Sequence, residues 1–370
     1  MRDSVNLRIP GPTPVPPDIL KAVAQPMIDH RGRSFAALIQ RAAERLKDFF
    51  LTKQEVLILS TSGTGSMEAA VVNTLSPGDK ALAVSIGAFG DRFATIAETF
   101  GAQVKVLSYE WGQAADPEDV RKALAADPEI KAVLVTHNET STGVTNPLEE
   151  IAQVVREAER LLLVDAISSL GSIPCDTDGW GLDVVVTASQ KGWMVPPGLA
   201  FIALSERGWE ANQSARMPRF YMDVAKHRDL LQKGQTPWTP TVSVFFGLDV
   251  ALERMAAEGL EGVHARHARI GQMVREGVKA LGLELLVTDE RYASNTVTAI
   301  KCPEGVEVAA LRRMLEDEYS VVMAGGQARL AGKIFRIGHL GLVSEEDIRH
   351  ALDALAEVLP RVGYTIPARR

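Results

Sequence analysis

The sequence predicts an α/β protein whose core is a largely parallel sheet, followed by a smaller α+β region. Short apolar runs recur through the first half of the chain and are separated by segments with helical spacing. Continuous apolar strands of this kind are buried on both faces, which is typical of parallel sheets covered by crossover helices. With 370 residues, of which 46% are hydrophobic, the chain exceeds one ordinary core and can fill two.

The expected strands of this sheet follow one another in chain order. They span residues 56–59, 81–84, 104–107, 132–135, 161–164, 184–186 and 199–204. Two crossover helices have marked starting points, because Asp116-Pro117 and Asn146-Pro147 each offer an N-cap side chain and a proline at the first helical position. We therefore expect a helix to begin at each of these two places.

The tail has a different pattern from the first half. Long helices are expected over 241–258 and 262–280, strands near 296–300 and 334–337, and shorter helices near 306–317 and 344–358. Ser344 and Asp347 form a variant of the capping box at the start of the last helix. These elements predict an N-terminal segment of residues 1–16, a large domain of residues 17–260 and a small domain of residues 261–370, although one long helix could bridge the boundary near 260.

Composition and charge exclude several classes of protein. A net charge of −7 with scattered basic residues argues against a nucleic-acid partner. Cys175 and Cys302 form no CxxC pair, and the pair His264 and His267 is more typical of a solvated helix face than of a metal site, so no metal is predicted. The start of the chain lacks an apolar signal segment and no apolar run reaches the ~18 residues that span a bilayer. We expect a cytoplasmic protein without membrane partners.

Lys191 is the residue that points to chemistry. It follows an apolar, β-branched run that begins at Val184, and it lies in a turn rich in glycine and proline. A desolvated lysine loses part of its preference for the charged form, and a neutral amine can attack a carbonyl to form a Schiff base. The alternative is a lysine that merely ends a strand and points to solvent, so the neighbouring residues must decide.

Pyridoxal phosphate (PLP) would require a phosphate cradle, an anion beside the pyridine nitrogen and a lysine. The segment 61–68 is the candidate cradle, because its glycines allow backbone N–H groups to approach an anion at a helix start. A Rossmann fingerprint would need Gly or Ala at Glu68, and a P-loop would need Gly-Lys-Ser/Thr after the turn. The alternative for this segment is a simple helix cap.

Asp165 is the candidate anion. It closes the apolar strand 161–164, where a buried carboxylate is costly unless a cation pairs with it. A protonated pyridine nitrogen would be such a cation, and a plain N-cap is the alternative. The spacing places Asp165 and Lys191 at neighbouring strand ends, where open α/β sheets bind their ligands.

Seven motifs distributed over nearly the whole chain resemble class V aminotransferases of PLP fold type I. They lie at residues 10–14, 62–66, 137–143, 164–171, 189–192, 196–198 and 336–341. The resemblance is greatest to the alanine–glyoxylate and serine–glyoxylate (serine–pyruvate) aminotransferases. It implies an aspartate aminotransferase-like fold, with a mostly parallel seven-stranded sheet in a large PLP-binding domain, a smaller α+β domain and an N-terminal segment that contributes to the active site.

The resemblance also implies roles for individual residues. Lys191 forms the Schiff base with PLP and Asp165 pairs with the pyridine nitrogen. The other cofactor-binding residues are Thr64, Gly65 and Ser66 at the phosphate, Gln190 at the phosphate or nearby, Thr140 near the ring hydroxyl, and Phe89 stacked on the ring where relatives often carry tryptophan. Thr239 matches a segment that reaches the phosphate of a partner subunit, which implies a homodimer with its active site at the subunit interface.

Arg336 is the implied substrate anchor. A guanidinium can grip a carboxylate with two parallel hydrogen bonds, and every α-amino or α-keto acid has a carboxylate. The alternative is a structural ion pair with an acidic neighbour. Gly11 is expected to complete the substrate pocket through its backbone.

The predicted reaction is ping-pong transamination of alanine or serine with glyoxylate or pyruvate, in which the freed Lys191 amine acts as general base. A 2-aminoethylphosphonate–pyruvate aminotransferase is an alternative, and Arg31, Arg33 or Arg329 could then bind the phosphonate. A PLP-dependent lyase or desulfurase would need a cysteine in the loop 323–330, which has none, and a non-catalytic PLP-binding module would need a further domain. The donor, the acceptor and the roles of these arginines and of His30 stay open.

Overall fold

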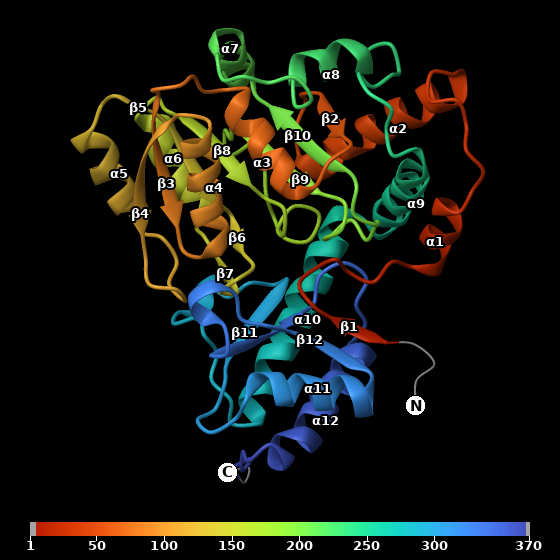
Figure 1. Ribbon diagram of the computed structural model, residues 1–370, viewed down its shortest axis with the longest axis vertical. Helices are drawn as coiled ribbons and strands as arrows, with labels where there is room; N and C mark the ends of the chain where they lie inside the picture. Colours follow the sequence, from red (N-terminus) through yellow and green to blue (C-terminus); the bar gives the residue numbers. More distant parts are fainter. Residues whose placement is uncertain (1–4, 368–370) are drawn as a thin grey trace.

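The structure is a computed structural model, and it describes residues 5–367. The chain forms a larger part around a seven-stranded sheet and a smaller part around a four-stranded sheet, which lie one above the other in Figure 1.

The seven-stranded sheet confirms the predicted architecture. Its strand order is β2-β10-β9-β8-β5-β3-β4. The strands are β2 (Val56–Leu59), β3 (Lys80–Ser85), β4 (Gln103–Ser108), β5 (Ile130–Thr136), β8 (Leu161–Asp165), β9 (Val184–Ala188) and β10 (Ala200–Leu204). All pairings are parallel except those of β10, which runs antiparallel to β2 and β9. Every residue of β2, β8, β9 and β10 is buried, as their unbroken apolar sequences require.

Helices cover both faces of this sheet, so each strand contributes to two apolar cores. Alternate residues of β2 show this: Val56 and Ile58 belong to one core, and Leu57 and Leu59 belong to the other. The first core is completed by α2 (Arg33–Phe50), α5 (Pro117–Ala126), α6 (Leu148–Glu157) and α9 (Val242–Glu258), and the second by α3 (Gly63–Val72) and α4 (Ala88–Thr99). Shorter elements are α1 (Pro17–Val23), α7 (Glu206–Ser214), α8 (Val224–Leu231) and the hairpin β6 (Asn138–Glu139) with β7 (Val144–Thr145).

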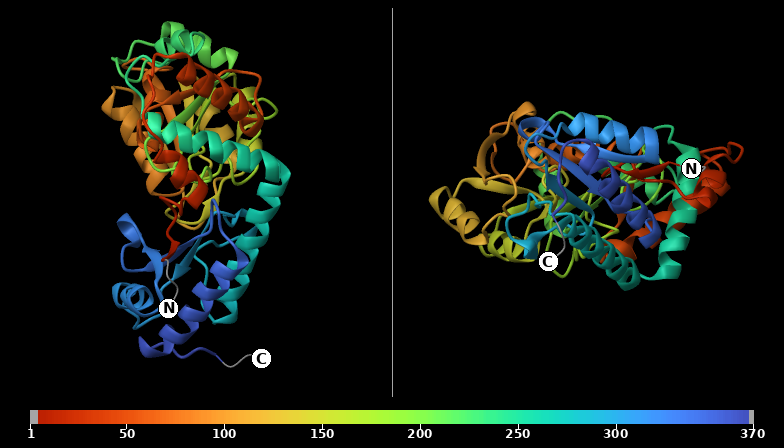
Figure 2. Two further views of the ribbon diagram at one scale, coloured as in Figure 1. Left: turned by 90° about the vertical axis from the view of Figure 1, so that its right-hand side faces the viewer. Right: turned by 90° about the horizontal axis from the view of Figure 1, so that it is seen from below.

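The smaller sheet has the order β1-β12-β13-β11 and includes the N-terminal strand. Its strands are β1 (Asn6–Arg8), β11 (Val297–Lys301), β12 (Val321–Gly325) and β13 (Ile334–Gly338), and its helices are α10 (Leu260–Ala280), α11 (Val308–Tyr319) and α12 (Glu345–Arg361). Two single 3₁₀ turns complete the list, η1 (Glu290–Tyr292) and η2 (Ala328–Leu330). The segment 323–330, which sequence analysis treated as a loop, begins as the end of β12. Figure 2 shows α10 running from α9 down along the smaller part.

Gly259 separates α9 from α10, with a φ of +78° that favours glycine, so two helices rather than one continuous helix meet near residue 260. The domain boundaries at residues 16 and 260 stay predictions. Among residues 5–367, none of the helices has the length and apolar character that crossing a membrane requires.

Three local expectations have clear outcomes. Asp116 caps α5 through the N–H of Glu118, and Ser344 forms the predicted capping box with Asp347. A helix does begin at the second place, but the N-cap role expected for Asn146 was wrong: α6 begins at Leu148 without a side-chain cap, because the Asn146 amide accepts the Ala115 N–H and donates to the Thr136 carbonyl.

The solvated-face interpretation was also wrong for His267. Its ring is fully buried, where Nδ1 contacts the Val263 carbonyl and Nε2 accepts the Gly341 N–H. It joins α10 to the segment that follows β13.

Candidate active site

Lys191 lies just beyond the carboxyl end of β9, in a turn packed against the N-terminal segment. The residue is only 9% exposed, and its Nζ donates to the Pro10 carbonyl at 2.5 Å. Gly11 has a φ of +130°, and a Cβ at this position would lie 2.7 Å from the Lys191 Nζ, so only glycine allows this close approach. Burial lowers the pKa of Lys191 to about 8, an effect that the charge of Asp165 opposes and that those of Arg336 and Arg92 reinforce.

Asp165 is the last residue of β8, the strand next to β9, and is 3% exposed. Its Oδ1 accepts the Ile167 N–H at 2.9 Å and its Oδ2 accepts the Thr136 hydroxyl at 3.2 Å. Both donors are neutral groups, and burial raises the pKa of Asp165 to about 6. The carboxylate is therefore ionised at neutral pH, in a place where a cation would stabilise it.

A cavity of about 250 Å³ opens in front of Lys191. Its walls come from the N-terminal segment, the start of α3, the first turn of α4 and the turn after β9. It brings together five of the predicted residues, Gly11, Thr64, Phe89, Gln190 and Lys191. The Gln190 side-chain oxygen is buried and has no hydrogen-bond partner among the described residues.

The start of α3 forms one wall, slightly earlier in sequence than predicted. Ser62, Gly63 and Thr64 line the cavity, whereas the Ser66 side chain is fully buried and donates to the Gly63 carbonyl at 2.7 Å. Ser62 is the N-cap and accepts the Gly65 N–H. Gly65 is needed for packing, since a Cβ there would lie 2.1 Å from the Thr61 hydroxyl. Ser62 and Gly63 belong to the candidate cradle 61–68, but the roles assigned to single residues there were given to Thr64, Gly65 and Ser66.

Glu139 was quoted within a motif but received no role, and it determines how α4 begins. Its fully buried carboxylate accepts the N–H groups of Phe89 at 3.0 Å and Gly90 at 3.1 Å, together with the N–H and the hydroxyl of Ser141. The Ser141 oxygen in turn accepts the Ala88 N–H. Burial raises the pKa of Glu139, and these four donors oppose the rise. The pair Glu139 and Ser141 therefore fixes the backbone that carries the Phe89 ring.

Arg336 projects from β13 of the smaller sheet and is 4% exposed. Its Nε donates to the Gly325 carbonyl at 2.9 Å, and its Nη1 donates to the Thr140 carbonyl at 2.9 Å and to the Gln327 side chain at 3.5 Å. These partners are uncharged oxygens, which is not the structural ion pair that sequence analysis kept as an alternative. Burial lowers the pKa of Arg336 to about 10, so the guanidinium stays charged at neutral pH.

Thr140 lies between Arg336 and the large sheet. Its carbonyl accepts from Arg336, and its hydroxyl donates to the Ser168 hydroxyl at 2.9 Å. Neither Thr140 nor Arg336 lines the cavity itself.

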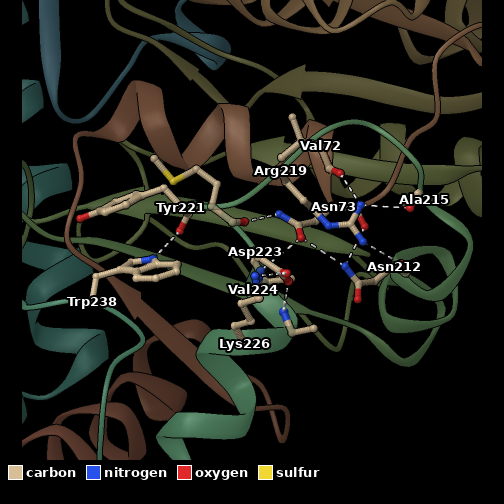
Figure 3. Close-up of polar contacts among 12 residues, drawn as sticks. Val72, Asn73, Asn212, Ala215, Arg219, Tyr221, Asp223, Val224, Lys226 and Trp238 are labelled. Carbon is tan, nitrogen blue, oxygen red and sulfur yellow. Dashed lines mark hydrogen bonds and ion pairs between the residues drawn. The ribbon is translucent and has the colours of Figure 1, made fainter.

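Thr239 is exposed and does not line the cavity of its own chain. Figure 3 shows how its neighbourhood is held: Asn73, just after the last turn of α3, donates to the Met222 carbonyl at 2.6 Å and accepts the Val224 N–H at 3.2 Å. Trp238 donates to the Tyr221 carbonyl at 3.1 Å and their rings stack. Asn73 therefore holds residues 222–224, and Trp238, the residue before Thr239, is bonded to the neighbouring Tyr221.

The arginines left without a role lie outside the cavity. Arg31 donates to the Thr236 carbonyl at 2.6 Å and to the Gln235 side chain at 3.1 Å, and so holds the segment before Thr239. Arg329 stacks over the Trp111 ring at 4.2 Å, beside a separate cavity of about 240 Å³.

Comparisons with known proteins agree with this geometry. The family described as "Aminotransferase class-V" matches residues 7–341. The L-aspartate–glyoxylate aminotransferase of Paracoccus denitrificans is 40% identical over 97% of this chain and 92% of its own length. The solved structure of pyridoxamine–pyruvate aminotransferase from Mesorhizobium loti superposes with a TM-score of 0.95 at 30% identity, covering 98% of this chain and 94% of that chain.

Another relative is named as a hydrogenase subunit and not as an aminotransferase. A protein of Synechococcus sp. (strain PCC 6716) named "Soluble hydrogenase, small subunit" is 45% identical over 99% of this chain and 95% of its own length. Within residues 5–367, no three His, Cys, Asp or Glu side chains are grouped so that they could hold a metal ion.

Proposed function

This chain belongs to the class V aminotransferases, and on that premise we propose that it uses PLP to transfer an amino group from alanine or serine to glyoxylate or pyruvate. One observation carries the proposal: a buried lysine of lowered pKa lines a cavity, and a buried carboxylate that accepts hydrogen bonds from two uncharged groups lies at the end of the neighbouring strand. The named activities of relatives, which use glyoxylate or pyruvate, support the choice of acceptor.

The residues present fit PLP at its ring nitrogen, its phosphate and its ring. Asp165 has the unbalanced charge that a protonated ring nitrogen would neutralise. The backbone at Ser62, Gly63 and Thr64 lies open to the cavity at a helix N-terminus, where a phosphate is stabilised. The unpartnered Gln190 side chain adds a polar group on the same wall. The face of Phe89 offers a surface for a ring.

When bound, PLP supplies an aldehyde for the Schiff base and a ring that withdraws electrons from the substrate Cα. The protein supplies the proton transfers. Because the pKa of Lys191 is lowered to about 8, more of its amine is neutral near neutral pH than in a free lysine, and the neutral amine can attack a carbonyl. The same Nζ, once free, would take the Cα proton as a base and would then, as an acid, give a proton to the carbon that had carried the aldehyde. Asp165 keeps the ring nitrogen protonated.

Arg336 binds the substrate carboxylate in this proposal. Its hydrogen bonds to the Gly325 and Thr140 carbonyls fix the orientation of the guanidinium without neutralising it. The substrate carboxylate can therefore form a charge-assisted hydrogen bond with the guanidinium, which these two carbonyls leave charged. Gly11, which allows the N-terminal segment to approach Lys191, lines the cavity beside this amine.

We also propose that the enzyme is a homodimer in which Thr239 completes the phosphate site of the partner subunit. The exposed position of Thr239, and the hydrogen bonds from Arg31 to the segment before it, support this assignment. The expected cytoplasmic location stays a prediction.

A panel of half-reactions tests the proposed function. Purified protein loaded with PLP should be yellow; alanine or serine should bleach the Schiff-base band, and glyoxylate or pyruvate should restore it. Aspartate, glutamate and 2-aminoethylphosphonate complete the panel, and a strong preference for the phosphonate would replace the proposed substrate with the alternative one. Lys191→Ala should abolish the band and lower turnover by at least about 10²-fold; full turnover in this variant would refute the mechanism.

A further inference from the structure

Arg92 is a cation at the cavity that has no role in the proposal so far. It lies one helical turn after Phe89 in α4 and lines the same cavity as Lys191. Its Nη1 donates to the Thr64 hydroxyl at 3.1 Å, and its guanidinium lies 4.6 Å from the centre of the Phe89 ring. These two partners are uncharged, and the adjacent Asp91 is engaged with the Ser85 hydroxyl.

The rest of the cradle is neutral. Ser62, Gly63, Thr64 and Gln190 offer hydroxyl, amide and backbone groups, and the start of α3 contributes only the partial positive charge of a helix N-terminus. A phosphate monoester carries nearly two negative charges at neutral pH. Neutral donors hold such a group less strongly than a guanidinium does, because charge-assisted hydrogen bonds are about twice as strong.

The two cations that line the cavity have different neighbours. Lys191 is bonded to the Pro10 carbonyl and feels the charge of Asp165, whereas Arg92 is bonded to the first turn of α3. An anion held at Thr64 would therefore meet the guanidinium of Arg92 rather than the amine of Lys191.

We propose that Arg92 is the cationic ligand of the cofactor phosphate, acting beside Thr64. The proposal rests on PLP being the cofactor and assigns a binding residue to that site. The anchoring of α4 supports it, because Glu139 and Ser141 fix the first turn of this helix and so fix the point from which Arg92 extends. The contact with Phe89 further limits where the guanidinium can lie.

Comparing PLP with pyridoxal, which has the same aldehyde and ring but no phosphate, tests this assignment. Both ligands are titrated into apo-protein and followed by the Schiff-base absorbance. Arg92→Gln should raise the Kd for PLP about tenfold to a hundredfold, the effect of losing one charge-assisted hydrogen bond, and leave the Kd for pyridoxal within about twofold. Arg92→Lys keeps the charge but loses the planar guanidinium, so its Kd for PLP should lie between those of the wild type and Arg92→Gln.

Inorganic phosphate provides a second measurement that does not depend on Schiff-base formation. Phosphate should raise the Tm of the wild-type apo-protein by mass action, and the rise should shrink in Arg92→Gln. Arg349→Gln is the matched control: Arg349 is an exposed arginine on α12, paired with Glu345 and remote from the cavity, so this variant should behave as wild type in both measurements.

Several outcomes would overturn the assignment. If Arg92→Gln weakens PLP and pyridoxal equally, Arg92 acts through Phe89 or the fold and not through the phosphate. An unchanged Kd for PLP in both Arg92 variants refutes it directly. If the wild-type protein forms a Schiff base with neither ligand, the proposed function itself fails, an outcome distinct from failure of the Arg92 assignment alone. If Arg92→Gln does not fold, the Kd values of Arg92→Lys for PLP and for pyridoxal are compared with those of the wild type.

Discussion

Two opposing electrostatic effects act on the Nζ of Lys191. Burial favours the neutral amine, and the nearby carboxylate of Asp165 favours the ammonium. Their balance leaves the pKa of Lys191 at about 8, against 10.5 for a free lysine, so the amine is available near neutral pH without being neutral throughout. At pH values well above 8 the amine is deprotonated, and at values well below 8 it must lose a proton before it can attack.

Asp165→Asn should therefore lower the pKa of Lys191 below about 8, because it removes the charge that favours the ammonium. The pH dependence of Schiff-base formation between apo-protein and pyridoxal measures this value, and the midpoint should move to lower pH. Turnover should nevertheless fall by about 10² or more, because the ring nitrogen loses its anionic partner. A midpoint that moves to higher pH would contradict this electrostatic picture.

Arg336 gives a second prediction at the residue scale. Arg336→Gln should reduce kcat/KM by about tenfold to a hundredfold for every substrate with an α-carboxylate, the effect of one lost charge-assisted hydrogen bond. Arg336→Lys should recover part of the loss. Steady-state kinetics with alanine and serine measure kcat/KM for each variant. The loss of kcat/KM should be the same for both donors. A loss confined to one donor would show that Arg336 recognises the side chain of that substrate and not its carboxylate.

Helix ends show what local sequence could and could not predict. Asp116-Pro117 and Asn146-Pro147 have the same pattern, yet only Asp116 caps its helix. The Asn146 amide instead bonds to the loop before α5 and to the end of β5, two earlier parts of the chain that the local pattern at Asn146-Pro147 does not include. Apolar runs and glycines were enough to predict the sheet and the start of α3. They also predicted that Asp165 and Lys191 lie at strand ends. Glu139 and Arg92 did not, because their roles depend on how α4 packs against its neighbours.

At the scale of elements, Glu139 holds the first turn of α4 as a cap supplied from another part of the chain. Glu139→Ala would leave the N–H groups of Phe89, Gly90 and Ser141 without an acceptor in a buried place. We expect a loss of about 2–4 kcal/mol in the free energy of unfolding of the apo-protein, measured with urea, and a weaker affinity for both PLP and pyridoxal because Phe89 loses its fixed position.

The cap of α12 is the control for this prediction. Ser344→Ala removes an N-cap far from the cavity and should cost about 1 kcal/mol of stability with no change in the Kd for PLP. If both variants lower stability and neither alters PLP binding, Glu139 is only a structural cap.

At the scale of the whole molecule, the candidate active site lies where the two sheets meet. Lys191 and Asp165 come from the large sheet, whereas Arg336 projects from the small one and is bonded across to Thr140. The N-terminal segment crosses between them, because it pairs with β12 and then bonds through Pro10 to Lys191. A rearrangement of one sheet against the other would therefore separate Arg336, the proposed substrate anchor, from the amine of Lys191.

Subunit mixing tests whether a second chain completes this site. Thr239→Asp should weaken PLP binding, because a carboxylate would face the phosphate, and Lys191→Ala should be inactive. In a mixed dimer of the two variants, one site combines an intact Lys191 with the intact Thr239 of the other chain. Random exchange should thus restore activity to about a quarter of the wild-type level, measured after co-refolding or subunit exchange. If Thr239 serves its own chain instead, every site keeps one defect, and the mixture has only the mean activity of the two parents.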